Sequence, residues 1–126
     1  MTSRPTFFRP SVALLDHDPA VCSALKFSLE LEGFQIMTFE EPETLRQALR
    51  KQAFDALIVG HAPPAIAAPE LFDQWPAETP RPPTVLTATN PTASLRRFAD
   101  KVGAILIEKP LLSDALVDAL RARIPS

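Results

Sequence analysis

Residues 54–64 read Phe54-Asp55-Ala56-Leu57-Ile58-Val59-Gly60-His61-Ala62-Pro63-Pro64, and this stretch decides the predicted fold. Its centre, residues 56–59, is a short apolar run with β-branched residues, and turn-forming residues follow it. That pattern is typical of a strand buried on both faces of a sheet. In an open parallel α/β sheet, ligands and chemistry collect at the carboxyl ends of such strands. Here that end is Gly60, which has no side chain, so any site there must use backbone or His61.

Four further strands are predicted around this one, at residues 12–15, 34–39, 84–87 and 104–108. Helices are predicted between and after them, at about residues 19–32, 42–52, 69–75, 91–102 and 114–124. Strands that alternate with helices form right-handed βαβ units with a parallel sheet. We therefore expect an α/β fold of the flavodoxin-like type, a doubly wound five-stranded parallel sheet of order 2-1-3-4-5 with helices on both faces.

Polar residues followed by proline mark the expected helix starts. Asp18 and Asn90 are predicted N-caps because each precedes a proline at the first helical position, and Ser113 is predicted to cap the last helix. Gly33 is the expected stop of the first helix. The apolar side of that helix is predicted to comprise Val21, Ala24, Leu25, Phe27, Leu29 and Leu31.

The composition favours one soluble domain. The chain has 126 residues, with 46% hydrophobic and 22% charged residues, which is ordinary for a globular core. A net charge of -2 gives no overall attraction to nucleic acid or to an anionic membrane, so neither is expected as a partner. The single Cys22 forms no internal disulfide, which fits a cytoplasmic protein. Residues 1–10 are expected to be a flexible arm and residues 11–126 the folded domain.

Three short motifs lie at the expected carboxyl ends of strands, and together they carry a resemblance to a known family. They are the segment from Leu15 to Pro19, the pair Thr87-Ala88, and the pair Lys109-Pro110. In this order and on these strands they resemble the CheY-like receiver domain of two-component response regulators. The resemblance implies a site where an aspartate on the third strand accepts a phosphoryl group, two acidic residues help to bind Mg²⁺, and a lysine and a hydroxyl residue bind phosphoryl oxygens.

The chain departs from that pattern at three positions. Gly60 stands where the acceptor aspartate would be, His17 stands at the second acid, and Leu106 replaces the usual aromatic residue. A glycine offers no nucleophile, and Asp16 alone is a poor Mg²⁺ site. We therefore predict a pseudo-receiver whose remnant pocket is Asp16, His17, Gly60, Thr87 and Lys109. It is expected to have no catalytic residue, no cofactor and no metal, with Lys109 paired to Asp16.

The resemblance also implies how such a chain acts. A receiver that takes no phosphoryl group signals through protein–protein contact, with a histidine kinase, a response regulator or another signalling protein as partner. The predicted interaction face lies on the fourth and fifth helices and the last strand, and homodimers of many receivers use this face. A plain solvated surface is the alternative for this face. Its residues are Arg96, Arg97, Asp100, Leu106, Asp118 and Arg121.

Three other interpretations stay open on the sequence. His17 and His61, with Asp16, could ligate a metal, although their spacing is not a known metal signature. Thr87 and Lys109 could hold a free anion. The chain could also be the receiver part of a longer transcriptional regulator, although no helix-turn-helix motif or basic stripe is present here.

Overall fold

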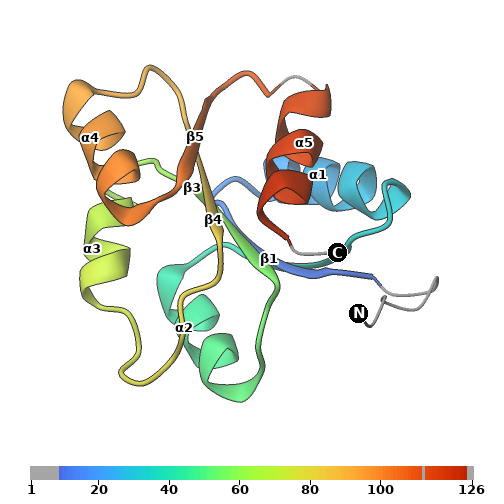
Figure 1. The fold of residues 1–126 in the computed structure, drawn as a ribbon, viewed down its shortest axis with the longest axis horizontal. Coiled ribbons are helices and arrows are strands. Elements are labelled where there is room, and N and C mark those ends of the chain that lie inside the picture. Colours follow the sequence, from blue (N-terminus) through green and yellow to red (C-terminus); the bar gives the residue numbers. More distant parts are fainter. Residues whose placement is uncertain (1–8, 112, 125–126) are drawn as a thin grey trace.

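The computed structural model describes residues 9–111 and 113–124, without the side chain of Ser113, and contains one five-stranded sheet (Figure 1). The strands are β1 (Ser11–Leu15), β2 (Gln35–Phe39), β3 (Ala56–Gly60), β4 (Thr84–Ala88) and β5 (Ile105–Glu108). All neighbouring strands are parallel, and their order is β2-β1-β3-β4-β5. The predicted flavodoxin-like sheet order is therefore confirmed.

Helices cover both faces of this sheet. They are α1 (Pro19–Leu31), α2 (Pro42–Lys51), α3 (Ala68–Asp73), α4 (Ala93–Val102) and α5 (Ser113–Arg123). Helices α1 and α5 lie on one face, and α2, α3 and α4 lie on the other (Figure 1). No helix in the described part of the chain is long and apolar enough to cross a bilayer.

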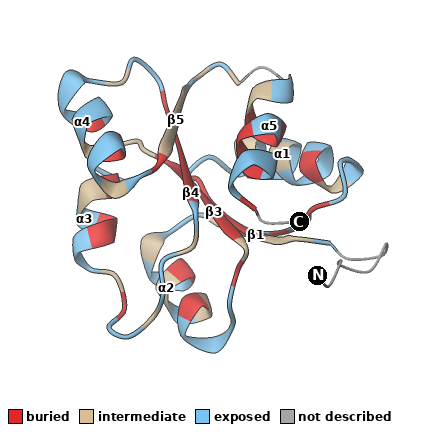
Figure 2. Ribbon diagram, in the orientation of Figure 1, coloured by how far each residue is buried: buried red, intermediate tan, exposed pale blue. Residues whose placement is uncertain are grey.

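Strand β3 is the centre of the sheet and is buried along its whole length, as predicted (Figure 2). Leu57 and Val59 pack in the core under α2, α3 and α4, whereas Ala56 and Ile58 pack in the core under α1 and α5. A strand whose alternate side chains enter two separate cores has no polar face, which explains the continuous apolar run. Its last residue, Gly60, lies opposite Thr87 of β4.

The helix ends confirm two of the predicted signals and correct a third. Asp18 caps α1 by accepting a hydrogen bond from the Ala20 N–H at 2.9 Å, and Gly33 follows the helix with φ +97°. Asn90 does not cap α4: it has φ +49° and lies in the turn before the helix. The N-cap is Thr92, which has the extended backbone that a cap requires and accepts from the Leu95 N–H at 3.1 Å.

The predicted apolar side of α1 was wrong for three of its residues. Phe27 and Leu31 are 59% and 75% exposed, and Ala24 is exposed as well. The buried residues of this helix are Cys22 and Leu29. Phe27 and Leu31 are each two positions from Leu29, or about 200° around the helix, and so point to the opposite side.

Two predictions fall wholly or partly outside the described residues. The expected cap at Ser113 concerns a side chain that is not described, although Ser113 itself is the first residue of α5. Of the expected N-terminal arm, only Arg9 and Pro10 are described. The Pro10 carbonyl accepts a hydrogen bond from the Gln35 N–H at 2.8 Å and extends the pairing of β1 with β2.

Candidate functional site

Asp16, the first residue after β1, is the buried centre of the predicted pocket. It is 1% exposed. Its Oδ2 accepts a hydrogen bond from the Lys109 ammonium at 3.0 Å, and its Oδ1 accepts from the Asp18 N–H at 2.9 Å. Each carboxylate oxygen therefore has a donor, which is what a buried charge needs. The predicted ion pair between Asp16 and Lys109 is confirmed.

Gly60 ends β3 directly against the Asp16 side chain. A Cβ built on Gly60 would overlap Asp16 Oδ2 and would lie 3.0 Å from Cγ and 3.4 Å from Cβ of Asp16. No positive φ is recorded for Gly60, so the backbone there does not demand glycine. Glycine is instead favoured by space, because the Asp16 carboxylate fills the volume that a side chain on this strand would occupy.

The neighbouring strand ends hold the lysine and the threonine beside this pair. Thr87 is 1% exposed and lies opposite Gly60, and its carbonyl accepts a hydrogen bond from the His61 N–H at 2.8 Å. The Lys109 N–H donates to the Ala88 carbonyl at 2.8 Å. These backbone bonds continue the sheet beyond its strands, so the positions of Thr87 and Lys109 are set by the sheet itself.

Neither neighbour of Asp16 in the sequence supplies a second free carboxylate. The His17 side chain is half exposed, and its Nδ1 lies 3.8 Å from Asp16 Oδ1, which is too long for a hydrogen bond. Asp18 is engaged as the cap of α1. Asp16 is therefore the one carboxylate in contact with Lys109 within the described ranges.

His61 has a structural role that the sequence did not reveal. Its Nδ1 accepts a hydrogen bond from the Ala68 N–H, at the start of α3, at 3.1 Å. Between them, Ala62 and Ile66 form a two-bond antiparallel bridge, and Ile66 is fully buried. Burial lowers the pKa of His61, which favours the neutral imidazole that can accept this bond. The single large apolar residue in a Pro/Ala loop was the available signal for the anchored turn.

The structure does not bring His17, His61 and Asp16 together as the ligands of a metal ion. Nowhere in the described part of the chain do three His, Cys, Asp or Glu side chains gather closely enough to hold a metal ion. His17 approaches Asp16, but His61 turns toward Ala68 and uses Nδ1 to accept a backbone bond.

Cys22 is a second neighbour of Asp16 that sequence analysis did not place. Its thiol lies 3.3 Å from the Asp16 carbonyl oxygen and 3.9 Å from that of Phe39. Burial raises the pKa of the Cys22 thiol, and the negative charge of Asp16 adds to the effect. The position of Cys22 one turn after the Asp18 cap, on the inner side of α1, was the signal for this contact.

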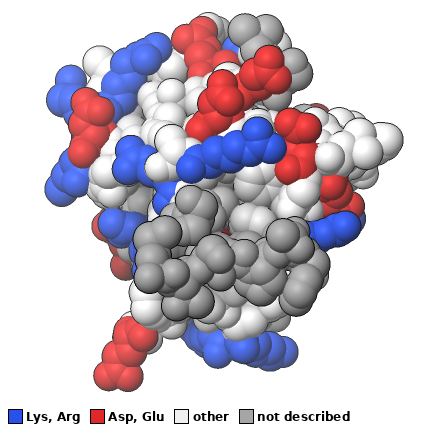
Figure 3. Space-filling model, turned by 45° about the vertical axis from the view of Figure 1, so that its right-hand side comes forward, with Lys and Arg blue, Asp and Glu red and all other residues white. Residues whose placement is uncertain are grey.

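The residues of the predicted interaction face lie on α4, β5 and α5. Arg96 on α4 reaches Glu108 of β5 at 3.4 Å. Arg121 on α5 turns toward the end of α1 and donates to the Glu32 carbonyl at 3.4 Å. Leu106 packs against the core under α4. Lys and Arg side chains lie among Asp and Glu side chains on the side shown in Figure 3. Arg97, Asp100 and Asp118 are exposed.

The strand order and the placement of Asp16, Thr87 and Lys109 define the CheY-like receiver fold, and solved structures agree. The receiver domain of a putative LuxO repressor protein from Vibrio parahaemolyticus has a TM-score of 0.81 and 17% identity, over 92% of this chain and 90% of that one. A CheY-like receiver domain protein from Methanospirillum hungatei gives 0.81 and 17%, over 91% and 93%. CheY4 of Vibrio cholerae gives 0.77 and 17%, over 93% and 100%.

A curated protein is similar to this chain at the sequence level. The C4-dicarboxylate transport transcriptional regulatory protein DctD of Pseudomonas aeruginosa is 31% identical over 111 residues, which is 87% of this chain. The match covers 24% of that protein, so the chain spans about a quarter of its length. No family model matches the chain.

Proposed function

We propose that this chain is a receiver-like signalling domain that takes no phosphoryl group and acts by binding another protein. The observation that carries the proposal is the Asp16 carboxylate in the space beside Gly60. In a receiver that space belongs to the phosphoacceptor and its phosphoryl group. Here it holds a carboxylate already bound to Lys109 at 3.0 Å.

The ion pair of Asp16 and Lys109 occupies the place that a phosphoryl group takes in a phosphorylated receiver. A receiver lysine binds the incoming phosphoryl oxygens, and here the ammonium of Lys109 is neutralised by a carboxylate of this chain instead. Breaking a buried pair by removing one partner costs about 3–5 kcal/mol. The pocket is therefore held in one arrangement, without the charge change that switches a receiver, and the signalling state is set by the fold.

The exposed side of α1 supports the proposal that the partner is a protein. Ala20, Ala24, Phe27 and Leu31 are all exposed, and they follow one another at spacings of four, three and four residues. This spacing forms a straight apolar seam of the kind that helices use to pack side by side. A partner with an amphipathic helix, as in a histidine kinase or another signalling protein, would cover Phe27 and Leu31.

Phosphorylation and Mg²⁺ binding test the first half of this proposal. The chain is incubated with acetyl phosphate and Mg²⁺ and examined by intact-mass spectrometry, beside a receiver with all its acidic residues. We expect added phosphoryl mass on the control receiver only, and no saturable heat of Mg²⁺ binding to this chain by calorimetry. A stoichiometric acyl phosphate on this chain would overturn the proposal.

Capture from the source cells tests the second half. The double variant Phe27→Ser/Leu31→Ser removes the seam, and Met37→Ser on β2, which is 42% exposed, is the matched control for losing an exposed apolar side chain. We expect a specific partner to be retained by the wild type and by the control but lost by the double variant. Retention by all three proteins would exclude the seam as the docking face.

A second candidate function is the receiver part of a longer transcriptional regulator. The observation that favours it is the alignment with DctD, which matches 24% of that protein. Sequencing of the transcript in the source cells, together with the mass of the endogenous protein, decides between the two. An output domain in the same reading frame would make this chain its regulatory module.

A further inference from the structure

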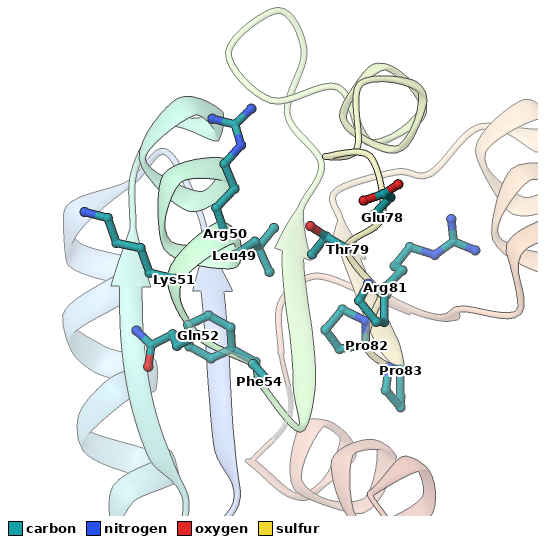
Figure 4. A pocket seen from close by; sticks show the side chains of 12 residues that line it. Leu49, Arg50, Lys51, Gln52, Phe54, Glu78, Thr79, Arg81, Pro82 and Pro83 are labelled. Carbon is teal, nitrogen blue, oxygen red and sulfur yellow. The ribbon is translucent and has the colours of Figure 1, made fainter.

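A groove lies at the end of the sheet opposite to Asp16. It has a volume of about 560 Å³ and runs between the carboxyl end of α2 and the loop before β4. In Figure 4, Arg50 and Lys51 come from the α2 side, whereas Arg81 and Pro82 come from the opposing loop. Leu49 and Phe54 also line the groove. We call this feature the basal groove.

A second hollow continues the basal groove. It has a volume of about 410 Å³, shares Arg81, Pro82 and Pro83 with the groove, and adds Arg123 from α5. The Arg81–Pro83 segment is thus a ridge with a hollow on each side. The two hollows together form one concave strip along the amino ends of β3 and β4.

The charge of this strip is opposite in sign to that of the whole chain. Its linings contain four cations, Arg50, Lys51, Arg81 and Arg123, against one carboxylate, Glu78. The chain as a whole has 13 Lys and Arg against 15 Asp and Glu. None of the four cations forms an ion pair with another residue of the described ranges. The strip is therefore a local positive surface whose charges are not neutralised by ion pairs within the described residues.

The loop that forms one wall is held in place. The Trp75 indole N–H donates to the Thr79 carbonyl at 2.9 Å, and the Leu57 N–H donates to the Pro83 carbonyl at 2.9 Å. The Arg81 guanidinium lies 4.6 Å from the centre of the Phe72 ring, and this contact restrains the Arg81 side chain. A wall that is already ordered loses little conformational entropy when a ligand binds.

From these observations we propose that the basal groove binds an acidic peptide segment of a partner protein. Carboxylates of the segment would pair with Arg50, Lys51 and Arg81 at the rims, and its apolar side chains would lie on Ala53, Pro80 and Pro83, which are the exposed apolar residues of the lining. An extended peptide supplies both kinds of side chain within a few residues. A nucleic acid would leave the apolar lining unused, and an anionic membrane is too flat to enter a groove. This proposal does not depend on the remnant pocket at the other end of the sheet.

Fluorescence anisotropy with labelled synthetic peptides tests the proposal on the whole chain. The probes are a short peptide of alternating Glu and Leu, one of alternating Glu and Ser, and one of alternating Gln and Leu. We expect saturable binding of the Glu-Leu peptide, at least tenfold weaker binding of the other two, and a Kd that rises with NaCl because rim charges are screened. Equal binding of the Gln-Leu peptide would overturn the proposal.

Charge-reversal variants locate the site. Arg50→Glu/Lys51→Glu and, separately, Arg81→Glu are each expected to weaken Glu-Leu binding at least tenfold. Arg96→Glu/Arg97→Glu on α4 has the same change of net charge as the first variant and is expected to leave binding within twofold. Thermal unfolding of each variant checks that it is folded. Unchanged binding by both groove variants, or an equal loss in the α4 control, would refute the site.

The same assay tests whether a ligand other than an acidic peptide occupies the basal groove. Binding of a labelled oligothymidylate or of phosphatidylserine vesicles to the groove, with no binding of the Glu-Leu peptide, would overturn the proposal. Sedimentation velocity over a range of concentrations tests a second copy of this chain. Self-association that the Arg81→Glu variant abolishes would also count against a partner peptide.

Discussion

Substitution of Gly60 by alanine tests the close approach at the end of β3. The added Cβ would overlap Asp16 Oδ2 and would lie 3.0 Å from Cγ, a distance tighter than nine in ten real Cβ contacts. Asp16 must then move away, and its bonds to Lys109 and to the Asp18 N–H lengthen.

The cost can be worked from those contacts. Overpacking of a full site costs about 1–3 kcal/mol, and a hydrogen bond to a charged group contributes about 1.5–3 kcal/mol. Because the two losses overlap, we expect Gly60→Ala to lower the free energy of unfolding by about 2–4 kcal/mol. Urea unfolding followed by the fluorescence of Trp75, the single tryptophan, measures it.

A double-mutant cycle shows whether Asp16 is the cause. In Asp16→Ala the carboxylate is gone, so adding Gly60→Ala should cost no more than about 0.5 kcal/mol, and the two changes should be strongly non-additive. Gly103→Ala is the matched control. Gly103 has φ +75° and no atom within 4 Å of an added Cβ, so its backbone strain should add to the cost of Asp16→Ala. A Gly60→Ala cost below about 0.5 kcal/mol, or simple additivity with Asp16→Ala, would refute the reasoning.

Three further predictions concern other parts of the fold. Burial lowers the pKa of His61 in the folded protein below its value in the unfolded chain. The contribution of neutral His61 to stability is therefore full above pH 6.5 and is lost as the pH falls through the lower pKa of the folded state. The variant His61→Asn should lose less stability between pH 7 and 5 in urea unfolding, and an unchanged dependence on pH would contradict this. Because burial raises the pKa of Cys22, its thiol should react with Ellman's reagent at least ten times more slowly in the folded protein than in urea, and equal rates would show that it is exposed. Leu29→Ala should cost about 2–5 kcal/mol by cavity formation, whereas Leu31→Ala, 75% exposed, should cost less than about 0.5 kcal/mol in the same assay; similar costs would contradict the orientation of α1.

The sheet could be predicted because its signals are local and repeated. Each strand is a short apolar run, and each helix follows a proline, a cap or both. Strand order then follows from the alternation of strands and helices, which leaves few arrangements open. The ion pair between Asp16 and Lys109 was within reach for the same reason, because both residues follow strands that end at one edge.

What could not be predicted depends on side-chain orientation over a few ångströms. The sequence shows that Gly60 lacks a nucleophile but not that the Asp16 carboxylate fills its space. It shows His61 after a strand but not that its ring accepts a bond from α3. On α1, apolar residues surround the helix, so periodicity alone could not separate the buried Leu29 from the exposed Phe27.

The most direct test of the central claim is phosphorylation of the variant Gly60→Asp. It supplies a carboxylate at the end of β3, but this carboxylate competes with Asp16 for the space beside Lys109, and His17 and Leu106 remain in place. After incubation with acetyl phosphate and Mg²⁺, intact-mass spectrometry should show far less than one phosphoryl group per chain. A stoichiometric acyl phosphate on this variant would show that the pocket is still functional and that one residue alone had silenced it.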